Sequence, residues 1–166
     1  MKTIAMLFSL VISMAFSCNK NDSKISPNFS CKIDGKQWNP YARDWKVQEI
    51  KCEIREDFRT IHINARNTSS SESVSIIVFP ESGRLKPGVK YPLNSNSYHT
   101  GVYTMQGNIQ FLTDSRNVGE FEIIEIDTSA NMIKGKFHFD CFNSELERSV
   151  KVTDGIFNIR YYAYSN

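Results

Sequence analysis

The sequence predicts an all-β fold, a single antiparallel β-sandwich, with a lipocalin-like half-open barrel as the alternative. Residues 120–164 are expected to form three long strands in series, because apolar and polar residues alternate along the second and third strands. Turn residues recur about every ten positions, as they do in sandwiches and barrels. No window shows a long period of 3.6 residues, so no long helix is expected. The alternation alone does not separate a sandwich from a barrel.

Residues 1–17 are predicted to be a lipoprotein signal peptide. The segment starts with a positive charge, residues 4–16 form an apolar run too short for a membrane span, and Ser17 precedes Cys18. This order resembles a bacterial lipobox, in which cleavage before the cysteine frees an amino group and a thiol for acylation. Phe16 is bulkier than the residue that the tightest lipobox has there. The alternative is an ordinary signal peptide cut nearby, with Cys18 incidental.

Residues 18–28 are predicted to be the lipidated Cys18 and a polar tether, and residues 29–166 a single all-β domain. We therefore expect an exported lipoprotein with palmitate-type acyl chains at Cys18. Its expected location is the cell envelope, with the anchor in the outer membrane on a face that the sequence leaves open.

The charge balance argues against a nucleic-acid partner. The chain has 20 Lys and Arg residues against 18 Asp and Glu residues. A nucleic-acid binder needs a basic stripe or patch, and a chain this close to neutrality does not indicate one.

The domain is predicted to begin with a β-hairpin. Residues 29–33 precede Asp34-Gly35, which suits the positive φ angles of a type I′ turn, and a short return strand ends at Trp38 before a proline. A serine-rich, solvated loop is expected over residues 67–73. Further strands are predicted over residues 47–54, 58–65, 73–79, 89–93, 98–105 and 109–113.

The last two predicted strands define the expected core. Residues 132–142 and 148–162 are predicted to pair in antiparallel fashion. The residues expected to point into one core are Phe137, Phe139, Phe157 and Ile159. His138 and Asn158 are out of phase with them and should face the opposite side of the sheet.

Three cysteines remain in the domain, and each is in phase with apolar neighbours. Cys31, Cys52 and Cys141 are expected to be buried thiols, with a Cys31–Cys52 disulfide as the alternative. No CxxC spacing occurs, and the histidines have no ligand spacing to each other. No metal site and no cofactor is expected.

No catalytic residue is predicted, and the chain is not expected to be an enzyme. The sequence lacks the GxSxG pattern of a nucleophilic serine, and its carboxylates alternate with apolar residues as on the wet face of a sheet. His62, His99 and His138 are expected to be surface residues rather than catalytic bases.

Aromatic residues are the remaining candidates for ligand contact. Trp38, Tyr41 and Trp45 cluster around a proline, and exposed rings there could stack on sugars or anchor a protein partner. The alternative is packing, in which Trp38 closes one end of the core and Tyr161 is interior.

Three stretches together resemble a family of small exported lipoproteins from Bacteroidota that is grouped as a domain of unknown function. The stretches are Cys31-Lys32-Ile33-Asp34-Gly35-Lys36-Gln37-Trp38, Met132-Ile133-Lys134-Gly135-Lys136-Phe137-His138-Phe139 and Val152-Thr153-Asp154-Gly155-Ile156-Phe157. The resemblance spans nearly the whole chain after the signal segment. It implies an all-β extracytoplasmic lipoprotein and supplies no activity or catalytic residue.

The expected function is a lipid-anchored binding or interaction module of the cell envelope without catalytic activity. Its partners would be the membrane, through the lipid at Cys18, and a glycan or an envelope protein. A β-barrel carrier of a small apolar ligand is the alternative. An accessory to an envelope hydrolase is a third possibility.

Overall fold

The computed structural model describes residues 28–44, 48–55, 57–95 and 98–164, which form strands and turns without a helix. The predicted signal peptide, Cys18 and Trp45 lie outside these described residues. The strands are β1 (Asn28–Ile33), β2 (Lys36–Trp38), β3 (Ile50–Arg55), β4 (Thr60–Asn67), β5 (Glu72–Val78), β6 (Lys90–Leu93), β7 (Thr100–Met105), β8 (Ile109–Leu112), β9 (Gly119–Asp127), β10 (Met132–Asn143), β11 (Arg148–Arg160) and β12 (Tyr162–Tyr164).

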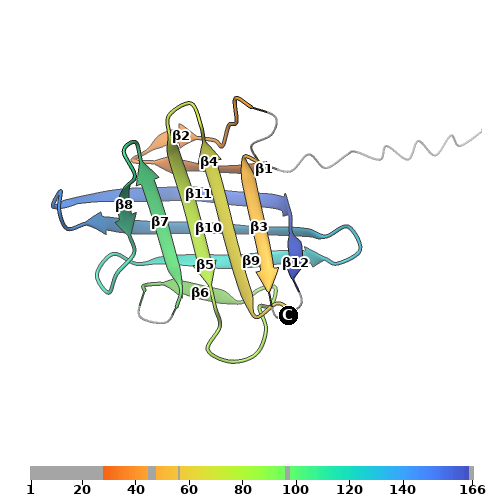
Figure 1. Cartoon of the computed structure of the whole chain (residues 1–166). Coiled ribbons are helices and arrows are strands. Elements are labelled where there is room, and N and C mark those ends of the chain that lie inside the picture. The colour runs from red at the N-terminus through yellow and green to blue at the C-terminus, as the bar shows by residue number, and fades with distance from the viewer. Residues whose placement is uncertain (1–27, 45–47, 56, 96–97, 165–166) are drawn as a thin grey trace, which may run out of the picture.

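The strands form one large, mostly antiparallel sheet that is not closed into a barrel. The order along the sheet is β12-β3-β4-β5-β7-β8-β10-β11-β1-β2, and β9 pairs with both β10 and β6. Figure 1 shows the sheet folded over itself, so that β3, β4, β5 and β7 form a front layer and β6, β9, β10 and β11 cross behind it. This architecture confirms the predicted all-β class, and the two layers enclose the core as in a sandwich with crossed strands.

The hairpin predicted at the start of the domain is present. Cys31 lies opposite Trp38 in the β1–β2 pair. Asp34 and Gly35 connect the strands with φ angles of 49° and 78°. Both values suit a type I′ turn, the two-residue connection that matches the twist of paired strands.

A β-bulge divides the long β10–β11 pair. Phe137 lies opposite Gly155, but Phe139 lies opposite Val152, so β11 accommodates one extra residue at this point. The bulge residue Asp154 has a φ of 51°. Because the bulge changes the phase of β11, Val152 before it and Phe157 after it both face the interior.

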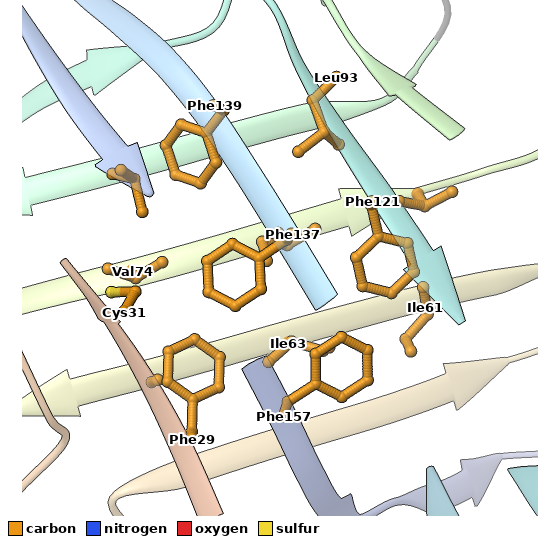
Figure 2. Close-up of a cluster of buried hydrophobic side chains, with 14 of the residues drawn as sticks. Phe29, Cys31, Ile61, Ile63, Val74, Leu93, Phe121, Phe137, Phe139 and Phe157 are labelled. Atoms are coloured by element: carbon orange, nitrogen blue, oxygen red, sulfur yellow. The ribbon is translucent and has the colours of Figure 1, made fainter. Parts of the chain in front are cut away.

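The inner faces of the two layers form a single apolar core. Figure 2 shows phenylalanine rings of the rear layer lying over Ile61, Ile63 and Val74 of the front layer. The rings of Phe121 and Phe157 are stacked, with centroids 5.3 Å apart and an interplanar angle of 3°. The predicted core residues are all buried, namely Phe137, Phe139, Phe157 and Ile159. His138 is exposed and Asn158 is partly exposed on the other face of the sheet, which confirms the predicted register.

Cys31, Cys52 and Cys141 are buried free thiols, as predicted from their phase. The alternative Cys31–Cys52 disulfide is not formed. Burial raises the pKa of the Cys31 thiol to about 12 and that of the Cys141 thiol to about 12. Burial likewise raises the pKa of Cys52, so all three thiols are held in the protonated form.

Two expectations about the chain were wrong. His99 was expected at the surface, but it is 5% exposed, with Nδ1 3.0 Å from the carbonyl oxygen of Pro92 and Nε2 2.9 Å from that of Phe79. The ring therefore links the carbonyl of Phe79, just after β5, to that of Pro92 in β6, and both carbonyls gain a hydrogen-bonding partner. The third closing strand was expected to continue through Tyr161, but β11 ends at Arg160 and β12 then pairs in parallel with β3.

Candidate ligand-binding site at the Glu72 end of the sandwich

Glu72, the first residue of β5, receives three hydrogen bonds from three parts of the chain. Trp38 Nε1 donates to Oε2 at 3.1 Å, Ser70 Oγ donates to Oε2 at 2.6 Å, and Tyr103 OH donates to Oε1 at 2.5 Å. Burial, and then the hydrogen bond to Glu72, raises the pKa of Tyr103, so the phenol stays a donor. The carboxylate is therefore held in one orientation. We call this part of the molecule the Glu72 end; β2 and the β4–β5 turn lie there, at the top of Figure 1.

A polar depression of about 320 Å³ lies beside Glu72. Its lining comes from the end of β4, the β4–β5 turn, the start of β5 and the β7–β8 region. The lining residues are Arg66, Asn67, Thr68, Ser71, Glu72, Ser73, Thr104 and Asn108. Every one of them has a polar side chain, so the depression offers donors and acceptors rather than an apolar surface.

Some lining side chains are used by the fold. Asn67 Nδ2 donates to the carbonyl oxygen of Asn39 at 3.0 Å, and Asn67 Oδ1 accepts from the backbone N–H groups of Ser69 and Ser70. Thr68 Oγ1 accepts from the backbone N–H of Arg43 at 3.0 Å. These bonds fix the β4–β5 turn against the segment that follows β2, so the depression has a preformed shape.

Other lining side chains have no partner within the described part of the chain. No hydrogen bond or ion pair engages the Arg66 guanidinium, the Thr104 hydroxyl or the Asn108 amide in those residues. Arg66 and Asn108 are exposed, and Thr104 is partly exposed. These three groups are free to bind a ligand.

The predicted aromatic group is divided between core and surface. Tyr41 pairs with Asn67 in an isolated bridge, donates its N–H to Arg66 O at 3.0 Å, and has 50% of its surface exposed. Trp38 is 6% exposed and packs edge-on against Phe29 at 6.2 Å, as the packing alternative predicted. Trp45 lies outside the described residues. Of the two described residues, Tyr41 has the exposed ring, and ligand binding by this group stays a prediction.

A second depression, of about 310 Å³, meets the first at Glu72. Here Asp34 Oδ2 lies 3.4 Å from Arg148 Nη2, and Asp34 Oδ1 accepts the backbone N–H of Lys151 at 2.9 Å. The lining residues are Ile33, Asp34, Lys36, Gln37, Trp38, Glu72 and Arg148. The β1–β2 hairpin thus supplies one wall, and the side chain of Glu72 lines both depressions.

Sequence reasoning missed Glu72, Arg66 and Asn108. The stretch 67–73 was predicted to be a solvated loop, and the composition of that stretch supports nothing more specific. Glu72 becomes recognisable through its contact with Trp38, which lies 34 positions earlier. No pattern in one short window records a contact of that separation.

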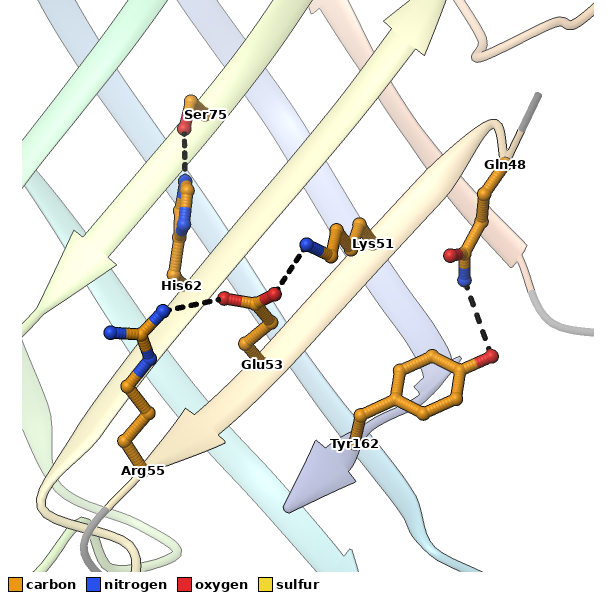
Figure 3. A network of polar contacts seen from close by, with 7 residues as sticks. All are labelled: Gln48, Lys51, Glu53, Arg55, His62, Ser75 and Tyr162. Atoms are coloured by element: carbon orange, nitrogen blue, oxygen red, sulfur yellow. Dashed lines mark hydrogen bonds and ion pairs between the residues drawn. The ribbon is translucent and has the colours of Figure 1, made fainter. Parts of the chain in front are cut away.

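The outer face of the front layer carries a separate polar network, shown in Figure 3. Glu53 is 7% exposed and forms ion pairs with Lys51 and with Arg55, the latter at 3.2 Å. The hydrogen bond from Lys51, and then the one from Arg55, lower the pKa of Glu53 below its usual value. The carboxylate is thus stabilised as an anion on this face.

His62 lies next to Glu53 on the neighbouring strand, with Nε2 3.0 Å from Ser75 Oγ. Burial lowers the pKa of His62, which favours the neutral ring. A Ser–His–acid triad needs the acid to hold the imidazole. Glu53 instead bonds Lys51 and Arg55, and in the described residues no bond joins it to His62. The network has the residue types of a triad without its geometry.

The described residues contain no group of three or more His, Cys, Asp or Glu side chains that could hold a metal ion. In the same residues, no helix is long and apolar enough to cross a membrane.

Comparison with known proteins identifies one family. The family with the description "Domain of unknown function (DUF6252)" matches residues 26–159, which includes both depressions and every strand except β12 and the last residue of β11. No curated protein and no solved structure matches the chain.

Proposed function

We propose that this chain, which belongs to the DUF6252 family, is an exported, lipid-anchored binding module of the cell envelope. The lipid anchor is supported by the order of a positive charge, an apolar run and Ser17-Cys18 at the start of the chain. The polar residues after Cys18 provide a tether that separates the domain from the membrane.

The observation that supports binding is the polar depression at the Glu72 end. Free side chains of Arg66, Thr104 and Asn108 line it, and the half-exposed ring of Tyr41 lies on the neighbouring segment. A guanidinium donates, whereas a hydroxyl and an amide both donate and accept. An aromatic ring offers a flat apolar surface. This combination suits a ligand rich in hydroxyl groups, and the ligand class that we propose is a glycan.

The alternative of a carrier for a small apolar ligand has less support. A carrier of that kind uses the interior of a closed barrel. The sheet is not closed, and the depressions at the Glu72 end are lined mainly by polar side chains. Binding at the surface therefore agrees better with the geometry.

The test is calorimetric titration of the whole chain in detergent solution with neutral and acidic oligosaccharides of two to six units. Thr104→Val removes a free hydroxyl and keeps the shape of the side chain, so binding should weaken about three- to tenfold. Thr100→Val on the same strand, outside the depression, is the matched control.

Tyr41→Ala tests the exposed ring, and Tyr164→Ala is its control because Tyr164 is 49% exposed on β12. Weaker binding by Thr104→Val and Tyr41→Ala, with both controls unchanged, supports the proposal. Failure of every oligosaccharide to bind, or binding that neither substitution weakens, overturns it.

A further inference from the structure

We infer that the ligand of the Glu72 end is an acidic glycan chain that occupies both depressions. The inference rests on the proposed function and specifies its ligand. The two depressions have similar volumes, about 320 and 310 Å³, and both are lined by Glu72. Because Glu72 lines both depressions, a chain of two or more sugar units can extend from one into the other.

The acidic side chains at this end are already engaged by the protein. Both oxygens of Glu72 accept hydrogen bonds, from Trp38 and Ser70 on one side and Tyr103 on the other. Asp34 is bound by Arg148 and by a backbone N–H. These bonds hold both carboxylates in fixed orientations, and a ligand hydroxyl that donates to either of them must use the acceptor sites that the protein donors leave.

The basic side chains are available, one at each depression. Arg66 lines the first and Lys36 lines the second. Both are exposed, and neither has an ion-pair partner among the described residues.

The donors to Glu72 are neutral and leave its charge in place, so the three cations Arg66, Lys36 and Arg148 stand against the two carboxylates Glu72 and Asp34, and the two depressions together carry a small excess of positive charge. An anionic group on the ligand can approach Arg66 and Lys36 without displacing a protein carboxylate. The hydroxyl and amide groups of Thr104 and Asn108 remain for the neutral parts of the sugar. A chain with carboxylate groups on successive units fits this arrangement, whereas the near-neutral charge of the whole protein disfavours a nucleic acid.

The test uses tetramers of galacturonate, mannuronate and guluronate, each compared with its own methyl ester. The ester has the same shape without the charge. The whole chain in detergent solution is titrated by calorimetry at low salt. At least one free acid should bind more tightly than its ester, and added salt should reduce the difference because it screens exposed charges.

Lys36→Gln and Arg66→Gln should each weaken binding of the acid by about fivefold, the effect expected of an exposed ion pair. Neither should weaken binding of the ester to the same extent. Lys86→Gln, in the loop between β5 and β6 at the opposite end of the molecule in Figure 1, is the control for Lys36. Arg160→Gln, at the end of β11, is the control for Arg66.

The outcomes separate this inference from the function on which it rests. Acid and ester could bind equally, with binding weakened by Thr104→Val but not by Lys36→Gln. That result would overturn the inference of an acidic ligand and leave a site for a neutral glycan. Tighter binding of a thymidylate oligomer of the same length also overturns it. If none of these tetramers and none of the oligosaccharides in the earlier titration binds, the proposed function is overturned as well.

Discussion

The indole N–H of Trp38 donates to Oε2 of Glu72 at 3.1 Å and joins the β1–β2 hairpin of the rear layer to β5 of the front layer. Trp38 is buried against Phe29, whereas Glu72 is partly exposed and lines both depressions. The bond therefore connects the apolar core to the candidate binding surface.

Loss of this bond should destabilise the protein. Trp38→Phe removes the donor and part of the ring, and we expect it to lower the free energy of unfolding by about 1–3 kcal/mol. Gln37→Ala, at the exposed neighbouring position, should stay within about 0.5 kcal/mol of the parent. The measurement is urea unfolding, and comparison with Glu72→Gln and the double variant isolates the coupling of the pair. A coupling energy of zero would show that the bond contributes nothing to stability.

The phase of β10 predicts opposite outcomes for two adjacent residues. Phe139 is fully buried, so Phe139→Ala should cost about 3–5 kcal/mol through lost burial and a residual cavity. His138 faces solvent, so His138→Ala should change stability by no more than about 0.5 kcal/mol. Both are measured by urea unfolding of residues 24–166. A larger loss for His138→Ala than for Phe139→Ala would show that the outer face is also covered.

The three buried thiols should react slowly in the native protein. Alkylation of Cys31, Cys52 and Cys141 needs the thiolate, and burial both raises their pKa and limits access. Labelling followed by mass spectrometry should show slow reaction in buffer and complete reaction in denaturant. Fast labelling of all three in buffer would contradict the strand phases described above.

The same thiols should make stability depend on pH in the alkaline range. The folded-state pKa of Cys31 is about 12, above the ordinary value of 9.0, so the unfolded chain releases its thiol proton first. This contribution to stability is complete below the ordinary pKa and decreases as the pH rises toward the folded-state value. Unfolding free energies between about pH 8 and about pH 11 should fall less steeply in Cys31→Ala than in the parent. Equal slopes would contradict the raised pKa.

Lipidation at Cys18 predicts a clear difference in labelling. Cells that express the full chain should incorporate labelled palmitate into the parent protein and not into Cys18→Ser, because the thiol at this position accepts the lipid. The parent should also partition with membranes, since a diacylglycerol and an acylated amino group provide more than one acyl chain. Equal labelling of the two proteins would rule out this anchor.

Most strand positions could be predicted from the sequence because the signal for a strand is local. Alternation places Phe137 and Phe139 on one face and His138 on the other, and the structure confirms this assignment. Asp34-Gly35 specifies a hairpin turn through its own backbone preferences. These signals lie within a few residues of one another, so they can be recognised in the sequence without knowledge of any distant contact.

The tertiary structure decided which distant segments meet. Gly135 and Gly155 lie in the stretches 132–139 and 152–157, and the rings of Phe157 and Phe137 lie against them. An added Cβ would come within 2.2 Å and 2.6 Å of those rings, so each position needs a glycine. His99 is buried where Phe79, just after β5, and Pro92 of β6 bring two carbonyl groups to its ring. Likewise, Glu72 meets Tyr103 through the pairing of β5 with β7, and it meets Trp38 only after the two layers fold together. The physical reason is that periodicity specifies which face of a strand is buried, whereas the partner across the core depends on pairings between segments tens of residues apart.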